Sequence, residues 1–508
     1  MLFEPAAHRS ETVRLDGERL ARLPGVRGQI ERMEADLAAG RNCVWLMPDE
    51  FVADGIAEEL HRTVLSRWPE HVHLPEPATT AETHPLVPET GWPGAVAGDV
   101  PVLDDFEDGF DIGWDGSPAP SATFSAPSGG PSELMTRLAK ELSTVPEAVV
   151  DQLTAPDGHW HPVIGVRAWT EPDPRQAPGG RVTERGHGIA RLIRALGAAI
   201  KESGLAPDRR PRVLVTGRLR DFPSWFPDEL ELELGTTGVH WWWGTIGRLD
   251  SATLLAGLGE ERGGPRSTGA GGAVLRARVL RAVREEVVSE LCGPDISLAV
   301  RLFACWDGSD RTLDDSLRAC LSVQRKEPPS DLPTVSSGAG IQHKPPSTLR
   351  KAWARGVLQT WEGRARLHPV VWHTDGGAGR PDRLSVLVSQ AQARVLMPWV
   401  EETRRRLAEM ALSHAKRPPR ELVELYVRRK LPDHATRPER TFVSAEAGDL
   451  QRACLQGHIG LPQEERLLLS SLVKVRNVLS HRGVLRDTEL ADLCDKLAAA
   501  DLRWTAEG

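Results

Sequence analysis

Residues 43–50 read Cys-Val-Trp-Leu-Met-Pro-Asp-Glu, and this stretch decides the class of fold that we expect for the first part of the chain. Cys43–Met47 is a short apolar run of the kind that forms a buried strand. The pattern predicts a polar helix before it, over Gln29–Ala39, and an amphipathic helix after it, from Pro48 to about Arg67. Strand, tight loop and helix in this order open an α/β unit.

The loop after this strand lies where a nucleotide-binding P-loop would lie. A P-loop holds phosphates with glycine amides and a lysine, whereas Pro48 has no amide hydrogen and Asp49 and Glu50 repel anions. Two interpretations stay open: a P-loop-like topology without the phosphate cradle, and an ordinary turn between a strand and a helix. An active NTPase is disfavoured in either case.

The α/β pattern continues to about residue 321. A helix over Gly188–Glu202 leads into an apolar strand over Arg212–Thr216, and helices are predicted at Val274–Leu291, Ile296–Phe303 and Leu313–Val323. We therefore predict an α/β domain over residues 1–321. This plan resembles a degenerate P-loop ATPase with a helical subdomain, over about residues 25–321.

An insertion at about residues 85–131 is rich in Pro, Gly, Ser and Asp, and we predict that it is disordered. The run Trp241-Trp242-Trp243 leaves two interpretations. Three successive indoles cannot share one face, so one of them stacks on a base or a partner, or all pack between two layers of the domain.

The second half of the chain is predicted to be helical. Residues 322–382 form a linker and connecting segment, with Pro328-Pro329 and Pro345-Pro346 near its ends. Residues 383–508 form an all-α bundle, within which Pro398 either kinks one long helix or starts a second one. The predicted fold is an α/β N-terminal region followed by an all-α C-terminal helical bundle.

Charge is distributed unevenly between the two halves. From Arg383 to Gly508 the chain has 21 Lys and Arg against 17 Asp and Glu, although the whole protein carries a formal net charge of −8. A polyanion is therefore expected to meet the C-terminal bundle. A candidate track for RNA includes Arg404, Arg405 and Arg406. The alternative is a solvated helix face, because glutamates are interleaved with these arginines.

Several classes of protein are not expected. The chain shows no apolar run long enough to span a membrane and no secretory leader, so we predict a cytoplasmic protein without a membrane partner. Its six cysteines are dispersed, which predicts neither a disulfide framework nor a zinc site, and we expect buried free thiols. No metal and no cofactor are predicted.

The helix predicted over Pro462–Gly483 has two distinct sides. Leu468, Leu472, Val475 and Leu479 recur at helical spacing and form an apolar stripe for the core. Asn477 and His481 project from the opposite side, with Ser470 and Lys474 beside them and Arg476 on the flank.

The run Arg476-Asn477-Val478-Leu479-Ser480-His481 resembles the R-N-x-x-x-H motif of HEPN domains, and the resemblance covers about residues 384–505. Many HEPN domains are metal-independent endoribonucleases in which two copies of the motif face each other across a dimer. The resemblance implies that His481 is the acid and base, that Arg476 binds the phosphate and that Asn477 orients them. It implies an RNA substrate, a homodimer through the C-terminal domain and products with 2′,3′-cyclic phosphate ends. Lys474 joins the candidate RNA-binding residues.

This layout is similar to bacterial conflict proteins, in which a sensor region restrains a toxic nuclease in antiviral defence or toxin systems. We therefore expect an effector ribonuclease regulated by its N-terminal region, with an operon-encoded protein as a further candidate partner. Catalytically silent HEPN domains also exist. The alternative is accordingly a non-enzymatic scaffold that dimerises through the helical domain and recruits partners through the acidic stretch at residues 99–116.

Overall fold

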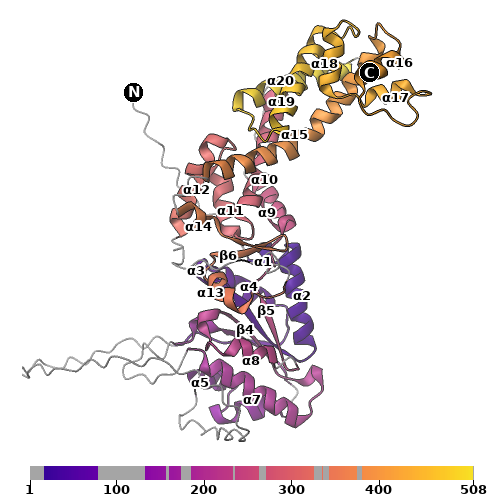
Figure 1. The fold of residues 1–508 in the computed structure, drawn as a ribbon. Coiled ribbons are helices and arrows are strands. Elements are labelled where there is room, and N and C mark those ends of the chain that lie inside the picture. The colour runs from indigo at the N-terminus through magenta and orange to yellow at the C-terminus, as the bar shows by residue number, and fades with distance from the viewer. Residues whose placement is uncertain are drawn as a thin grey trace, which may run out of the picture.

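The computed structural model describes residues 17–77, 132–155, 160–172, 185–232, 235–261, 271–324, 335, 342–374 and 380–506. The molecule is elongated (Figure 1). A sheet with its helices lies at one end, further helices occupy the middle, and the C-terminal helices reach the other end. This arrangement confirms an α/β N-terminal region with a parallel sheet and a mostly helical C-terminal part.

The N-terminal sheet is wholly parallel, and its strand order is β2-β3-β4-β1-β5. Strand β1 is buried along its whole length, as expected for a strand covered on both faces. It lies between β4 and β5, with Cys43 opposite Leu214 on one side and Gly238 on the other. The strands are β1 (Asn42–Met47), β2 (His71–His73), β3 (Val163–Arg167), β4 (Arg212–Arg218) and β5 (Thr237–Trp241).

The predicted helix from Pro48 to Arg67 is two helices, α3 and α4. Gly55 separates them because its backbone adopts a left-handed conformation, with φ of 77°. Helix α4 packs on β3 and β4, while α2 packs on β1 and β5. The helices of this region are α1 (Gly17–Ala21), α2 (Pro24–Ala38), α3 (Asp49–Ala53), α4 (Ile56–Leu65), α5 (Glu133–Glu141), α6 (Val149–Leu153), α7 (His187–Ser203) and α8 (Phe226–Leu232).

All three indoles of the run Trp241–Trp243 are buried between layers, which favours the packing interpretation. The Trp241 ring meets the Trp353 ring at a centroid distance of 5.2 Å, and Trp242 meets Phe51 at 4.8 Å. The Trp353 indole N–H also donates to the backbone carbonyl of Trp242 at 3.0 Å. Trp353 belongs to the connecting segment, so this segment is fastened to the sheet region.

The connecting segment contains more regular structure than the composition of a linker predicts. It forms α13 (Arg350–Ala354), an antiparallel hairpin of β6 (Leu358–Trp361) and β7 (Arg364–Leu367), and α14 (Pro369–Thr374). The hairpin turns at Glu362 and Gly363, which both have positive φ angles, as a type I′ turn requires.

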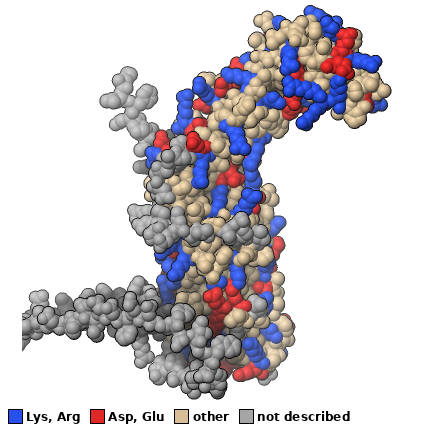
Figure 2. Space-filling model, viewed as in Figure 1, with Lys and Arg blue, Asp and Glu red and all other residues tan. Residues whose placement is uncertain are grey.

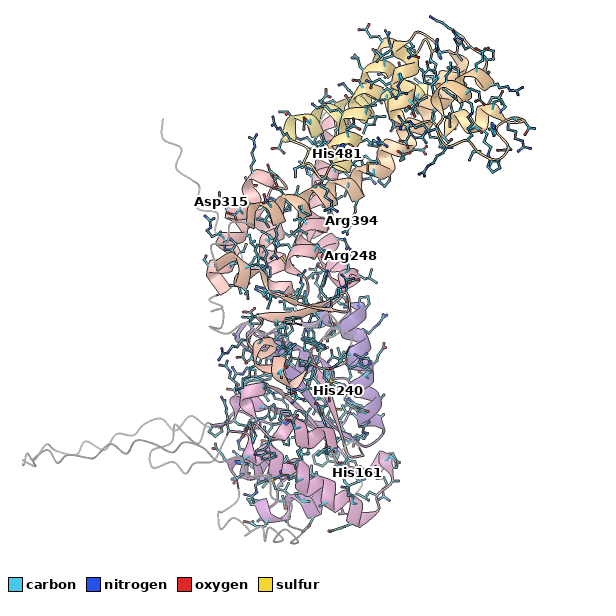
Figure 3. All side chains as sticks on the ribbon, in the orientation of Figure 1. His161, His240, Arg248, Asp315, Arg394 and His481 are labelled. Carbon is cyan, nitrogen blue, oxygen red and sulfur yellow. The ribbon has the colours of Figure 1, made fainter. Side chains whose placement is uncertain are left out.

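The remaining helices form one continuous region. Helix α10 packs along α15 and α20, so helices from the predicted first and third domains touch. Glu286 of α10 accepts from Arg248 of α9 and from Arg394 of α15 (Figure 3). These helices are α9 (Arg248–Glu261), α10 (Gly271–Cys292), α11 (Ile296–Cys305), α12 (Asp310–Gln324), α15 (Arg380–Ser413), α16 (Pro419–Tyr426), α17 (Pro438–Val443), α18 (Ala447–Leu455), α19 (Gln463–Ser480) and α20 (Asp487–Ala506).

Two predictions from the sequence concern Pro398 and the acidic insertion. Pro398 lies inside the continuous helix α15 and does not start a second helix. The predicted acidic insertion at residues 85–131 lies outside the described residues. None of the helices in the described parts of the chain has both the length and the apolar content that crossing a bilayer requires.

Candidate functional site

Helix α19 holds the candidate site, and its two sides differ as the sequence predicts. The apolar stripe is buried at all four positions, Leu468, Leu472, Val475 and Leu479. The opposite side is open, because Ser470, Lys474 and Asn477 are exposed. Packing of the stripe therefore fixes the rotation of the helix and directs the candidate residues away from the bundle core.

The helix ends earlier than predicted, at Ser480, so His481 is the first residue beyond it. Arg482 takes the left-handed position, with φ of 57°, which glycine more often occupies. The Gly483 amide then donates back to the Val478 carbonyl at 2.8 Å and closes the last turn. His481 consequently lies on a tight turn whose backbone is hydrogen-bonded to the helix.

The side chains of Asn477 and His481 are accessible to a ligand. Both residues are exposed, and neither side chain makes a hydrogen bond or ion pair with the part of the chain that the structure describes. His481 lies near the end of the C-terminal helices that adjoins the middle of the molecule, away from their tip (Figure 3). This position puts the candidate site close to the helices that follow the sheet region.

Arg476 is held by a neighbouring helix. Its Nη2 lies 2.8 Å from Oε2 of Glu446, the residue that precedes α18. The side chains are 38% and 59% exposed, so this ion pair contributes little to folding, at most about 1 kcal/mol. A guanidinium has five N–H donors, and the pair leaves several of them for a phosphate.

The turn that carries His481 is anchored on its other side by Gln392 of α15. The Gln392 side chain accepts from the Leu485 amide at 2.8 Å and donates to the Leu485 carbonyl at 3.2 Å. Both residues are buried. The Ser309 hydroxyl, just before α12, also donates to the carboxylate of Asp487, the first residue of α20, at 3.2 Å. The segment that follows His481 is therefore anchored to α15 before α20 begins.

The candidate RNA track divides into residues with different surroundings. Arg404 is mostly buried and donates to the carbonyls of Val443 and Ala445, at 2.7 and 2.8 Å, where helix α17 ends. This intramolecular role differs from the RNA contact that the sequence suggested, because its donors satisfy otherwise open carbonyl groups.

Arg405, Arg406 and Lys474 are exposed but paired with carboxylates. Arg405 and Arg406 both meet Glu402, and the hydrogen bond from Arg405 lowers the pKa of that glutamate. Lys474 lies 2.9 Å from Glu489 of α20. Basic and acidic side chains are interspersed over the C-terminal helices (Figure 2), as on a solvated helix face.

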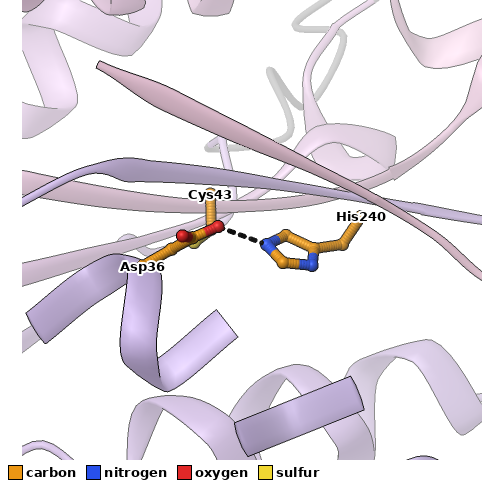
Figure 4. Close-up of side chains that lie close together, drawn as sticks. All are labelled: Asp36, Cys43 and His240. Carbon is orange, nitrogen blue, oxygen red and sulfur yellow. Dashed lines mark hydrogen bonds and ion pairs between the residues drawn. The ribbon is translucent and has the colours of Figure 1, made fainter. Parts of the chain in front are cut away.

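One cluster of side chains offers metal-ligand atoms in the described part of the chain. Asp36, Cys43 and His240 bring an oxygen, a sulfur and a nitrogen within 4.8 Å of one another (Figure 4). His240 Nε2 lies 3.0 Å from Asp36 Oδ2, and Arg41 Nη1 lies 2.7 Å from the other oxygen of Asp36. Burial lowers the pKa of His240 and raises that of Cys43. Each of these three side chains is already hydrogen-bonded or ion-paired within the fold. The cluster joins the end of α2 to β1 and β5.

The cysteines differ in part from the expectation of buried thiols. Cys43, Cys292, Cys320 and Cys494 are buried, but Cys454 is half-buried and Cys305 is exposed. The sulfur atoms of Cys305 and Cys320 lie 3.5 Å apart. The hydrogen bond from Cys320 lowers the pKa of Cys305 to about 7.

Comparison with known proteins gives no further information about the site: no protein-family model, curated protein or solved structure matches this chain.

The positioning residues Glu446 and Gln392 were missed by sequence reasoning. Glu446 is 30 positions from Arg476, and Gln392 is 93 positions from Leu485. Contacts across such separations leave no local pattern in a single sequence, whereas the motif on α19 lies within six consecutive residues.

Proposed function

We propose that the C-terminal helices form a HEPN-like, metal-independent endoribonuclease. One observation carries the proposal: an exposed imidazole and an accessible guanidinium, His481 and Arg476, lie at the same end of a helix whose other side is buried. We propose a cytoplasmic effector in a bacterial defence or toxin-type system, with the N-terminal region as its regulator. Contact of α10 with α15 and α20 supports such regulation.

The residue types fit cleavage of RNA without a metal. The reaction requires a base for the ribose 2′-OH, a cation for the crowded phosphate and an acid for the departing 5′ oxygen. In the proposed mechanism His481 exchanges the proton, because imidazole titrates near neutral pH. Arg476 binds two phosphate oxygens with its remaining N–H groups, and Asn477 orients the phosphate.

The first test is cleavage of RNA by the purified full chain in EDTA. We expect fragments that end in 2′,3′-cyclic phosphate, because the 2′ oxygen attacks the neighbouring phosphorus and the 5′ oxygen leaves. Treatment of the fragments with a phosphatase and a 2′,3′-phosphodiesterase, followed by mass spectrometry, identifies these ends. Cleavage that depends on added metal, or fragments with 5′-phosphate ends, contradicts the mechanism. A chain that dimerises but cleaves no RNA is the proposed alternative, a silent scaffold.

The proposed dimer needs a surface beside the motif. Leu467 is 52% exposed and precedes Lys474 by seven residues, or nearly two helical turns, so it lies on the open side of α19. In the proposed dimer this side chain is removed from water, which favours association. Ser470, which is exposed and small, would allow two such helices to approach each other closely.

Leu467→Asp is therefore expected to convert the dimer to a monomer and to lower RNA cleavage with it. The introduced carboxylates would be buried against each other across the two-fold axis, where like charges repel. Light scattering after size exclusion measures the mass. Leu249→Asp is the matched control, because Leu249 is a leucine with 66% exposure on α9. An unchanged dimer in the Leu467 variant would exclude this surface from the interface.

A further inference from the structure

A cavity of about 570 Å³ opens at the carboxyl edge of the parallel sheet. Strands β1 and β4 are neighbours there, with Met47 opposite Arg218. The connection leaving β1 runs to β2, whereas the connection leaving β4 runs to β5 on the other side of β1. A topological switch point therefore lies between β1 and β4. In open α/β sheets this crevice is where ligands bind.

The lining of this cavity, which we name the sheet-edge pocket, is strongly basic. One wall follows the strands, with Asp49 after β1 and Arg220 after β4, and α13 of the connecting segment supplies the other. Five cations face two carboxylates, Asp49 and Asp228. The cations are Arg185, Arg220, Arg350, Lys351 and Arg355.

Two of these cations are already paired within the fold. Arg350 lies 2.6 Å from Asp228 and 3.2 Å from Glu231, with its guanidinium over the Trp241 ring. Arg185 lies 3.4 Å from Asp221 and donates to backbone carbonyls. The guanidinium groups of Arg350 and Arg185 are therefore already paired with carboxylates of the fold.

The other three cations are available to a ligand. Lys351 and Arg355 are exposed, and their side chains make no hydrogen bond or ion pair with any residue that the structure describes. Arg220 is 60% exposed, and its contact with Asp49 is loose, at 3.5 Å. Burial raises the pKa of Asp49, while the neighbouring Arg220 acts in the opposite direction. Accessible guanidinium and ammonium groups that converge on one cavity are typical of sites for phosphate groups.

The turn after β1 does not supply the usual backbone cradle. Pro48 has no amide hydrogen, and the helix α3 that follows has only five residues. The turn after β1 therefore leaves the phosphate to other groups of the pocket, and the three available cations come from the β4 turn and the connecting segment. The cavity is larger than a single phosphate requires, and its volume lies within the range of small-molecule sites.

We propose that the sheet-edge pocket binds a nucleoside di- or triphosphate through Arg220, Lys351 and Arg355. The apolar lining, Leu219, Phe222, Pro227 and Ala354, then faces the nucleoside. Binding joins the sheet edge to the segment that leads into α15, so a nucleotide in this pocket fastens the N-terminal region to the start of the C-terminal helices. The inference concerns binding alone and stands apart from the proposed ribonuclease.

Calorimetric titration of the full chain tests the ligand class, with ATP, ADP, AMP and inorganic tripolyphosphate as probes. We expect the affinity to fall from ATP to ADP to AMP, because each phosphoryl group removed takes away charge-assisted hydrogen bonds. ATP is expected to bind more tightly than tripolyphosphate, because only ATP occupies the apolar lining. Equal affinity for these two would exclude a nucleotide site, and lack of ATP binding would overturn the proposal.

The double variant Lys351→Ala/Arg355→Ala tests the residues. We expect its ATP affinity to fall about 100-fold, at about tenfold for each cation removed. Arg364→Ala is the matched control, an exposed arginine on β7 outside the pocket, and should bind ATP as the parent does. Both cations are exposed, so circular dichroism and the melting temperature should be unchanged. A folded double variant with parental affinity would show that ATP binds elsewhere.

Discussion

Replacing His481 with alanine is expected to lower RNA cleavage by about 10²–10⁴-fold, the usual contribution of a general acid and base. Because this side chain is exposed and makes no hydrogen bond or ion pair with the described residues, its removal should leave the melting temperature unchanged. Arg476→Ala is expected to lower the cleavage rate about 10²–10³-fold, because in the proposed mechanism it removes donors to a phosphate that gains charge in the transition state. Single-turnover cleavage of a labelled RNA in EDTA measures both effects.

His414→Ala is the matched control for this experiment. His414 is also an exposed histidine of the C-terminal helices, at the end of α15, and its ring is hydrogen-bonded to local groups. The His414→Ala variant should cleave RNA at the parental rate. Equal rates for the parent, His414→Ala and His481→Ala would mean that the cleavage comes from another site or another protein, and the proposed mechanism would be abandoned.

Local patterns in the sequence were sufficient for the parallel strands and for α19. Strand β1 is a continuous apolar run because both faces are covered, and such a run is visible without any partner. The stripe on α19 is visible for the same reason, since residues at helical spacing share one face. The β6–β7 hairpin leaves only a weak strand pattern in the sequence, because each strand has only four residues and β7 carries two arginines.

Roles that depend on distant contacts could not be predicted. Arg404, Arg405 and Arg406 are consecutive arginines that follow the same two glutamates, yet only Arg404 reaches the end of α17. The sheet-edge pocket draws its cations from positions more than 100 residues apart, such as Arg220 and Lys351. The fold brings these residues together, and a single sequence carries no periodicity that links them.

Gln392→Leu tests whether the turn that carries His481 must be held in place. The substitution removes both hydrogen bonds to Leu485 and leaves its buried amide and carbonyl without these partners, at a cost of about 1–3 kcal/mol for each group. We expect faster hydrogen exchange at the Leu485 amide and a lower melting temperature. Cleavage is expected to fall about 10–100-fold, because small displacements of a catalytic group have effects of this size.

The matched control is Gln390→Leu, on the same helix two positions away, where the glutamine is exposed. It should change neither exchange at Leu485 nor cleavage. A merely structural role for Gln392 predicts faster exchange with an unaltered cleavage rate in the folded fraction, and that result would separate the turn from the reaction. Loss of cleavage together with faster exchange, while RNA affinity is retained, is expected only if His481 acts from the geometry that Gln392 maintains. The two readouts therefore distinguish a positioning residue from one that only stabilises the bundle.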